Sequence, residues 1–342
     1  MGLGLAALLI IGGCVGVGGP MPKAPAHHRA RGFVNENPAF ARPDFWSLQA
    51  FRLRRLWAAL AGGPAPPSFP RVANDGRALR ANREAATVTW IGHATLLVQL
   101  DGVNVLTDPQ FSERASPVRF AGPRRLNPPG LAFEDLPPIH AVVISHDHYD
   151  HLDRPTVQRL AAAHRPRFFV PLRFKAWFRA AGITDVEELD WWESRTIGSV
   201  TFTATPVQHW SARTPFDTNR RLWAGWAIAG RERRLFFAGD TGYYDGFRRI
   251  GKRLGPFDLT LVSIAAYEPP SVMAHTHTTP EESLRLFRDV GGRTFVAIHW
   301  GTFDLSEESI DEPPRRLAAA ARAQGLPDAR VWILAHGETR AW

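Results

Sequence analysis

The segment "ISHDHYDHLD", residues 144 to 153, holds three histidines and three aspartates at the end of the apolar run "AVVI". Imidazoles and carboxylates are the usual protein ligands of divalent transition metals. Crowding them together without a cation would combine the cost of desolvation with repulsion between carboxylates. The spacing therefore predicts a metal centre on this loop.

Three further candidate ligands each end an apolar run elsewhere in the chain: "TFTATPVQH" ends in His209, "RLFFAGD" in Asp240 and "TFVAIH" in His299. Strand ends are rigid platforms, and loops that leave them can converge on one point. We therefore expect these residues to join the loop. Together they make seven candidate ligands, which are His146, His148, Asp150, His151, His209, Asp240 and His299.

Seven ligands exceed the demand of one catalytic zinc, which takes about three protein ligands and a water. They divide over two metals if one group is shared, and the two oxygens of Asp240 make it the natural bridge. Two metals about 3.5 to 4 Å apart can hold a bridging hydroxide and stabilise attacking and leaving oxygens. The pattern therefore predicts a hydrolase that works through a dinuclear-metal-bridging hydroxide.

Other residues near these motifs have two interpretations each. Asp108 in "LTDP" either orients a ligand histidine or caps the bend at Pro109. His93 in "IGHAT" either lines the site or is satisfied within the core, which is the commoner case. Tyr149, between two ligands, is expected to face a substrate phosphate.

The composition of the 342-residue chain, 44% hydrophobic, is that of a globular protein with one large domain or two modest ones. A formal net charge of +8 is spread over isolated arginines, which favours a basic solvated surface and leaves attraction to anionic lipid or phosphate open. No nucleic-acid-binding signature is present, so we expect no nucleic-acid partner. The single cysteine excludes an internal disulfide.

The first residues, "MGLGLAALLIIGGCVGVGGP", form an uncharged apolar stretch with small residues just before Cys14. This resembles a bacterial lipoprotein signal peptide, in which the lipobox cysteine is lipidated. We expect residues 1–19 to be a signal peptide with its lipobox at Cys14 and the start of a tether. The protein would then be lipid-anchored in the bacterial cell envelope, facing the periplasm. A plain membrane anchor or a misplaced start is the alternative.

Residues 20–84 are expected to form a tether and an N-terminal helical segment. The tether, residues 20–43, is expected to be exposed, with His27 and His28 solvated. Asp44 is a candidate N-cap for a helix that stops at glycines 62 and 63. One side of this helix would carry an apolar stripe of Trp46, Ala50, Leu53, Trp57 and Leu60. Packing in the core is the commoner explanation of such a stripe, and contact with a membrane interface is the alternative.

Residues 85–342 form the expected catalytic domain, in which short β-rich runs predominate and helices are interspersed. Such a mixture, of the α/β (α+β) class, fits two sheets with helices on their outer faces.

The motif "HDHYDH" matches the HxHxDH signature of the metallo-β-lactamase superfamily, and the three later ligands follow in that family's order. The chain also resembles the N-acylphosphatidylethanolamine-hydrolysing phospholipase D family over about residues 85 to 315. The stretches that carry the resemblance are "VTWIGHATLLVQLDGVNVLTDPQFSERASP", "LPPIHAVVISHDHYDHLD", "VQHWSAR", "FFAGDTGYYDGF", "AAYEP" and "AIHWGTFDLSEE". It implies an αβ/βα four-layer sandwich with a dinuclear zinc site in the cleft between the sheets.

The resemblance also implies a role for each ligand. One zinc would be held by His146, His148 and His209, the other by Asp150, His151 and His299, with Asp240 bridging. "MAHTHTTPEE" resembles the stretch that carries a further active-site histidine, here His277, although Thr276 replaces a side-chain amide. The first 80 residues match only around "GFVNENP", so substrate-channel residues there do not transfer.

These observations predict a metal-dependent phospholipase D-type phosphodiesterase that acts on N-acylphosphatidylethanolamine-like phospholipids at a membrane surface. Asp150 and His277 would be catalytic, and Tyr149 and His277 would bind substrate. The cofactor would be two Zn²⁺ per chain, although the ligands also admit Mn²⁺ or Fe²⁺. The alternatives are a lactonase or other carbonyl ester hydrolase, a soluble nucleotide phosphodiesterase, and a lipid-anchored non-catalytic envelope protein.

Overall fold

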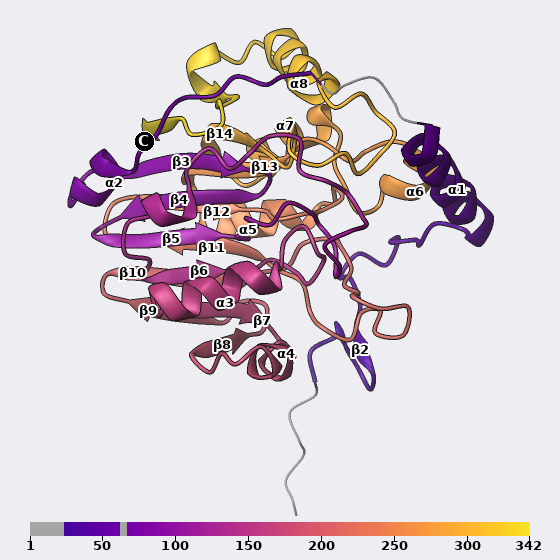
Figure 1. Ribbon diagram of the computed structural model, residues 1–342, viewed down its shortest axis with the longest axis horizontal. Coiled ribbons are helices and arrows are strands. Elements are labelled where there is room, and N and C mark those ends of the chain that lie inside the picture. The colour runs from indigo at the N-terminus through magenta and orange to yellow at the C-terminus, as the bar shows by residue number, and fades with distance from the viewer. Residues whose placement is uncertain (1–23, 62–66) are drawn as a thin grey trace, which may run out of the picture.

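Two seven-stranded sheets form the centre of the computed structural model, which describes residues 24–61 and 67–342 (Figure 1). The first sheet runs in the order β16 (Thr339–Ala341), β3 (Thr87–Gly92), β4 (Thr95–Leu100), β5 (Val103–Thr107), β6 (Ala141–Val143), β7 (Arg167–Pro171), β8 (Val186–Leu189). The second runs β15 (Val331–Trp332), β14 (Gly292–Ile298), β13 (Phe257–Ser263), β12 (Arg234–Phe237), β11 (Gly225–Ala229), β10 (Val200–Thr205), β9 (Ser194–Ile197). The predicted signal peptide with Cys14 lies outside the described residues.

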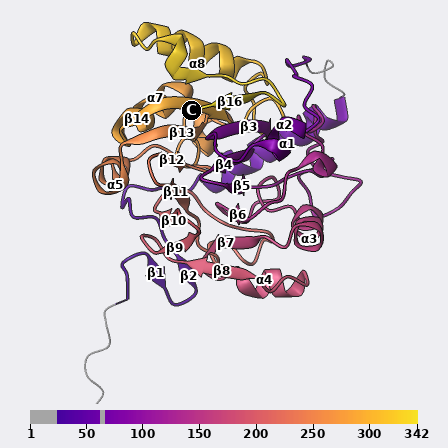
Figure 2. The ribbon, with the colours of Figure 1, turned by 90° about the vertical axis from the view of Figure 1, so that its left-hand side faces the viewer.

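Helices flank both sheets (Figure 2). On the side of the first sheet lie α2 (Arg77–Ala81), α3 (Arg154–Ala163) and α4 (Lys175–Ala180). On the side of the second lie α5 (Gly246–Leu254), α7 (Pro280–Asp289) and α8 (Glu312–Ala323). Short 3-10 turns cover Phe133–Asp135 and Asp328–Arg330. The predicted αβ/βα four-layer sandwich is confirmed.

Strand β4 shows how the sequence builds two cores. Its side chains alternate between the two faces of the sheet, as they must in an extended strand. Leu96 and Val98 enter the core between the sheets, whereas Leu97 enters the core beneath α3 and α4. Because all three are fully buried, the strands are fixed from both faces and their ends are rigid.

The direction of the strands places their ends at a common edge. In the first sheet β5 to β8 are parallel, and in the second β12 to β14 are parallel. Strand β10 is antiparallel to β11, which is antiparallel to β12, so β10 runs in the same direction as β12. The loops that follow β6, β10, β12 and β14 therefore leave from carboxyl ends, where open α/β sheets commonly bind ligands.

Helix α1 (Phe45–Ala61) begins as predicted, because the Ser47 backbone N–H donates to the Asp44 carboxylate at 3.0 Å. Its aromatic residues, however, face solvent: Trp46 is 77% and Trp57 64% exposed. The favoured expectation that these side chains pack in the core is wrong.

Polar contacts hold α1 in place instead. Arg54 pairs with Glu307 at 2.7 Å and Arg55 with Asp304 at 2.9 Å. The helix also contacts the short α6 (Pro270–Met273), as Figure 1 shows at the right of the sandwich. These contacts use the arginine side of the helix and so leave the aromatic side uncovered. Within the described residues, no helix is both long and apolar enough to cross a membrane.

Candidate metal centre

The loop that follows β6 is held by Asp108, which lies just after β5. Its fully buried carboxylate accepts a hydrogen bond from the Ser145 backbone N–H at 2.6 Å. It also lies 2.7 Å from His151 Nδ1. A carboxylate at Nδ1 fixes the ring so that Nε2 is free to bind a metal. Asp108 thus orients a candidate ligand histidine, the first of the two interpretations of "LTDP".

One group of candidate ligands consists of His146, His148 and His209, whose nitrogens lie within 4.8 Å of one another. His146 Nε2 is 2.8 Å from His148 Nδ1, which in turn is 3.3 Å from His209 Nε2. His209 Nδ1 lies 2.9 Å from the Thr276 carbonyl oxygen, to which it donates. The donated hydrogen bond leaves His209 Nε2 facing the group. These are the three residues that the resemblance assigns to one zinc.

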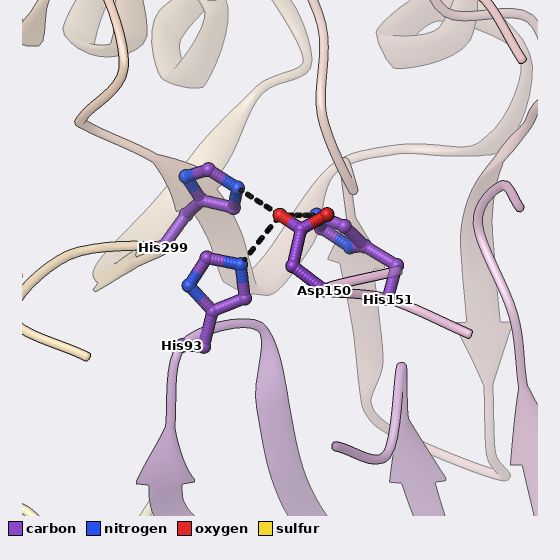
Figure 3. A group of neighbouring side chains, drawn as sticks. All are labelled: His93, Asp150, His151 and His299. Carbon is purple, nitrogen blue, oxygen red and sulfur yellow. Dashed lines mark hydrogen bonds and ion pairs between the residues drawn. The ribbon is translucent and has the colours of Figure 1, made fainter. Parts of the chain in front are cut away.

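A second group surrounds Asp150, with three imidazoles around its carboxylate (Figure 3). Asp150 Oδ2 is 2.9 Å from His93 Nε2, 3.2 Å from His151 Nε2 and 3.4 Å from His299 Nε2. The sequence leaves two interpretations of His93, and the structure supports the one in which it lines the site. It lies here because the turn between β3 and β4 opens at the same edge as the ligand loops, a placement that "IGHAT" alone does not reveal.

Two histidines of this group have left-handed backbones. His93 has φ 56° and His299 has φ 66°, values that cost energy for residues with a Cβ. The backbone N–H of His299 donates to the carbonyl oxygen of His93 at 3.0 Å. This hydrogen bond helps to hold both residues in their left-handed conformations. Such strain concentrates at functional sites.

Asp240, which follows β12, lies between the two groups. Its Oδ2 is 3.1 Å from Nε2 of both His151 and His299, and 3.9 Å from His146 Nε2. It thus reaches residues that the resemblance assigns to different zinc ions. The position suits the predicted bridge, which stays a prediction.

The buried nitrogen and oxygen atoms of the cluster suit divalent cations. Several of its buried atoms have no hydrogen-bond partner among residues 24–61 and 67–342, namely His148 Nε2, His151 Nε2, His299 Nε2 and Asp240 Oδ1. Buried polar atoms are rarely left without a partner, because each lost bond costs free energy. A cation would satisfy these atoms together. Imidazole and carboxylate suit zinc, and they also admit manganese or iron.

The electrostatics of His151 and His299, the two histidines nearest Asp240, point the same way, whereas burial lowers the pKa values of His146, His148 and His209. Burial disfavours the charged form of His299, yet the Asp240 and Asp150 carboxylates outweigh it and raise the pKa of His299 to about 9. Burial opposes charge at His151 too, and the same two carboxylates hold its pKa well above the usual value. A place where imidazoles gain a proton despite burial favours positive charge, which metal ions supply.

His277 lies beside this cluster, in the segment that leads into α7. Its Nδ1 is 3.9 Å from Asp240 Oδ2 and has no hydrogen-bond partner in the part of the chain that the structure describes. Burial lowers the pKa of His277 to about 4, so its imidazole is neutral at pH 7. A neutral imidazole here can donate one N–H bond to a molecule in the site. The structure thus places His277 where the sequence expects it, and its role stays a prediction.

The Tyr149 side chain contacts Arg213. Its hydroxyl donates to the Arg213 carbonyl at 2.8 Å, and the Arg213 guanidinium lies 4.0 Å above its ring. Both line a hollow of about 910 Å³ that none of the seven candidate ligands lines. A contact between Tyr149 and a substrate phosphate stays a prediction, but its hydroxyl proton already has an acceptor.

The N-terminal segment contributes contacts that the sequence pattern missed. Asn35 binds the backbone of His209 from both sides: its side-chain N–H donates to the carbonyl at 2.8 Å, and its Oδ1 accepts from the N–H at 3.0 Å. Phe33 is buried in the main core. The expectation of an exposed tether is wrong for this part of residues 20–43. The one signal was the faint resemblance around "GFVNENP".

Replacing Asp108 by asparagine should weaken metal binding about 10- to 100-fold, the usual effect of losing an outer carboxylate that orients a ligand histidine. Titration against a chromophoric chelator measures it. The control is Asp153→Asn, since Asp153 ends the loop that follows β6 but binds Ser112 and Thr156 instead of a ligand histidine. Equal losses in both variants would show that Asp108 supports only the loop.

A family model described as the β-lactamase superfamily domain matches residues 103–300. An uncharacterised protein of Mycobacterium tuberculosis is 40% identical over 318 residues, which cover 89% of this chain and 84% of that protein. N-acyl-phosphatidylethanolamine-hydrolyzing phospholipase D 1 of Caenorhabditis elegans is 43% identical over 238 residues, which cover 66% of this chain and 67% of the worm protein.

Solved structures support the fold. The metallo hydrolase Igni18 from the archaeon Ignicoccus hospitalis aligns with a TM-score of 0.59 and 20% identity, over 76% of this chain and 99% of that chain. An isothiocyanate hydrolase from Delia radicum gut bacteria aligns with a TM-score of 0.59 and 22% identity, over 75% of this chain and 99% of that chain. At these identities the likeness concerns the arrangement of the sheets and helices alone.

Proposed function

Because the chain belongs to the metallo-β-lactamase superfamily of metal-dependent hydrolases, we propose that it cleaves a phosphodiester bond in N-acylphosphatidylethanolamine-like phospholipids. The observation that carries the proposal is the 43% identity with the worm phospholipase D. The cluster of imidazoles and carboxylates supports it, because such a site suits hydrolysis.

The position of each residue in the cluster suggests its role in the reaction. His146, His148 and His209 would hold one divalent cation and Asp150, His151 and His299 the other, with Asp240 between them. The cations would supply a water of lowered pKa and positive charge for the phosphate oxygens. His277, 3.9 Å from Asp240, would donate an N–H hydrogen bond from its neutral imidazole to a phosphate oxygen or to the leaving oxygen. Hydrolysis would form a bond from a water oxygen to phosphorus and break the bond from phosphorus to the N-acylethanolamine oxygen. The products would be phosphatidic acid and N-acylethanolamine, whose oxygen takes a proton.

The purified protein should release N-acylethanolamine and phosphatidic acid from N-acylphosphatidylethanolamine micelles, and a chelator should stop the release. Mass spectrometry identifies the products. The parallel measurement uses an acyl-homoserine lactone, since the same site chemistry can attack a carbonyl carbon. If the lactone is hydrolysed efficiently while the phospholipid stays intact, the protein is a carbonyl ester hydrolase and the proposal is wrong.

We also propose that the protein is lipid-anchored at a bacterial membrane surface through Cys14, which lies outside the described residues. An acyl chain contributes about 0.8 kcal/mol per buried methylene, so lipidation should dominate membrane attachment. Cys14→Ser should therefore move the protein from the membrane fraction to the soluble fraction. If the variant still pellets with membranes, another segment such as the aromatic side of α1 is the anchor.

A further inference from the structure

His27 and His28, expected to be solvated, instead bind the side chain of Asp190. His27 Nε2 is 2.7 Å from Asp190 Oδ1, and His28 Nε2 is 2.8 Å from Asp190 Oδ2. The three side chains form a candidate group of metal ligands with all ligand atoms within 4.8 Å of one another. The group shares no residue with the seven ligands described above, and the chain separates the histidines from Asp190 by more than 160 residues.

The surroundings hold this group in position. His27 is only 8% exposed and stacks on Trp191 with ring centroids 4.1 Å apart. Hydrogen bonds also hold Asp190. Its backbone N–H donates to the Glu193 carboxylate at 2.9 Å, and its Oδ1 accepts from the Trp191 backbone N–H at 2.8 Å. The ligands are therefore arranged before any ion arrives, which lowers the entropy cost of binding.

The group also lies at a junction of the fold. Asp190 belongs to the link between β8 and β9, which are edge strands of the two different sheets. The histidines belong to the hairpin of β1 (His28–Arg29) and β2 (Gly32–Phe33) and the residue before it. Figure 2 shows this hairpin beside β8 and β9 at the lower end of the molecule.

Two imidazoles and one carboxylate are a common donor set for Zn²⁺, with bonds of about 2.0 to 2.2 Å. Around a tetrahedral ion with such bonds, ligand atoms lie about 3.4 Å apart. The present contacts of 2.7 and 2.8 Å need to open by about 0.6 to 0.7 Å to reach this separation. The His28 side chain is 27% exposed, so an ion can enter and complete its coordination with water.

We propose that His27, His28 and Asp190 bind a divalent transition-metal cation such as Zn²⁺, separate from the catalytic centre, that fastens the N-terminal segment to the link between the sheets. A cation that binds only the folded chain stabilises it. The segment continues to Asn35, whose amide holds the backbone of the ligand His209. The bound cation therefore steadies the support of the catalytic centre without taking part in the reaction.

The experiment compares bound Zn²⁺ in the full chain and in two variants after dialysis against micromolar free Zn²⁺ at neutral pH, measured by elemental analysis. The wild type should hold one equivalent more than His28→Gln or Asp190→Asn. Zn²⁺ above the catalytic requirement should raise the Tm of the wild type alone. Glutamine can still donate a hydrogen bond to Asp190 but is a poor zinc ligand. His28→Gln therefore distinguishes a cation site from a group that is held together by hydrogen bonds alone. His164→Gln, a partly buried histidine on α3's C-terminal side, is the control.

Equal Zn²⁺ content in the wild type and both variants overturns the proposal and leaves a group that is held together by hydrogen bonds alone. Loss of all bound metal in a variant also contradicts a separate site. Because the readout is a difference in stoichiometry, it does not depend on which substrate the catalytic centre accepts. Circular dichroism confirms that each variant is folded, and Asp190→Asn, which keeps the side-chain shape, decides the matter if His28→Gln is unstable.

Discussion

Asp240→Ala is expected to lower the bound metal of the catalytic centre from about two equivalents to one or less and to reduce turnover more than about 10⁴-fold. The reason is its position. Within the described residues, the Asp240 carboxylate lies 3.1 Å from His151 and His299 of one group and 3.9 Å from His146 of the other. Removing it also takes away one of the carboxylates that lie beside the crowded imidazoles of His151 and His299.

Elemental analysis and turnover of the phospholipid, measured on the same preparation, check this expectation. Asp245→Ala is the matched control, because Asp245 follows five residues later and is exposed. Asp150→Asn and His299→Ala, which alter only one group, should bring the metal of the catalytic centre toward one equivalent and abolish turnover. Full activity in Asp240→Ala, or full activity with a single metal, would contradict the dinuclear mechanism.

His277→Ala should reduce kcat/KM for the phospholipid about 10²- to 10⁴-fold, the usual contribution of a positioned acid, base or hydrogen-bond donor. A phosphodiester carries anionic oxygens before the reaction begins, so a donor beside Asp240 acts on both substrate and transition state. A lactone is neutral at the start and gains less. The loss should therefore be smaller on the lactone, and the metal content should not change.

The comparison needs kcat/KM of the wild type and variant on both substrates. His275→Ala is the control, since His275 is an exposed histidine two residues away. A fall in metal content would make His277 a ligand, as its place in a group with His209 and Asp240 allows. Equal losses on both substrates would show that it does not distinguish phosphate from carbonyl chemistry.

The sequence pattern alone predicts most of the residues of the metal-binding cluster. His209, Asp240 and His299 each end a short apolar run, and the other four candidate ligands follow the run "AVVI". A short apolar run of this kind favours a buried strand with polar residues at its end. Parallel strands put those ends at one edge, so His146, His209, Asp240 and His299 had to approach one another once the sheets formed. Asp44 as the cap of α1 was equally local, since a cap needs only the next three residues.

The remaining features depend on contacts between segments far apart in the chain. His93 joins the second group, and Asp108 orients His151, only because neighbouring strands end at one edge. The aromatic stripe of α1 is exposed because distant acidic residues hold the helix by its arginines. A periodic pattern shows which residues share a face, whereas the partner of that face is chosen by tertiary packing. His27 and His28 show the same limit, since their neighbour Asp190 lies more than 160 residues away in the chain.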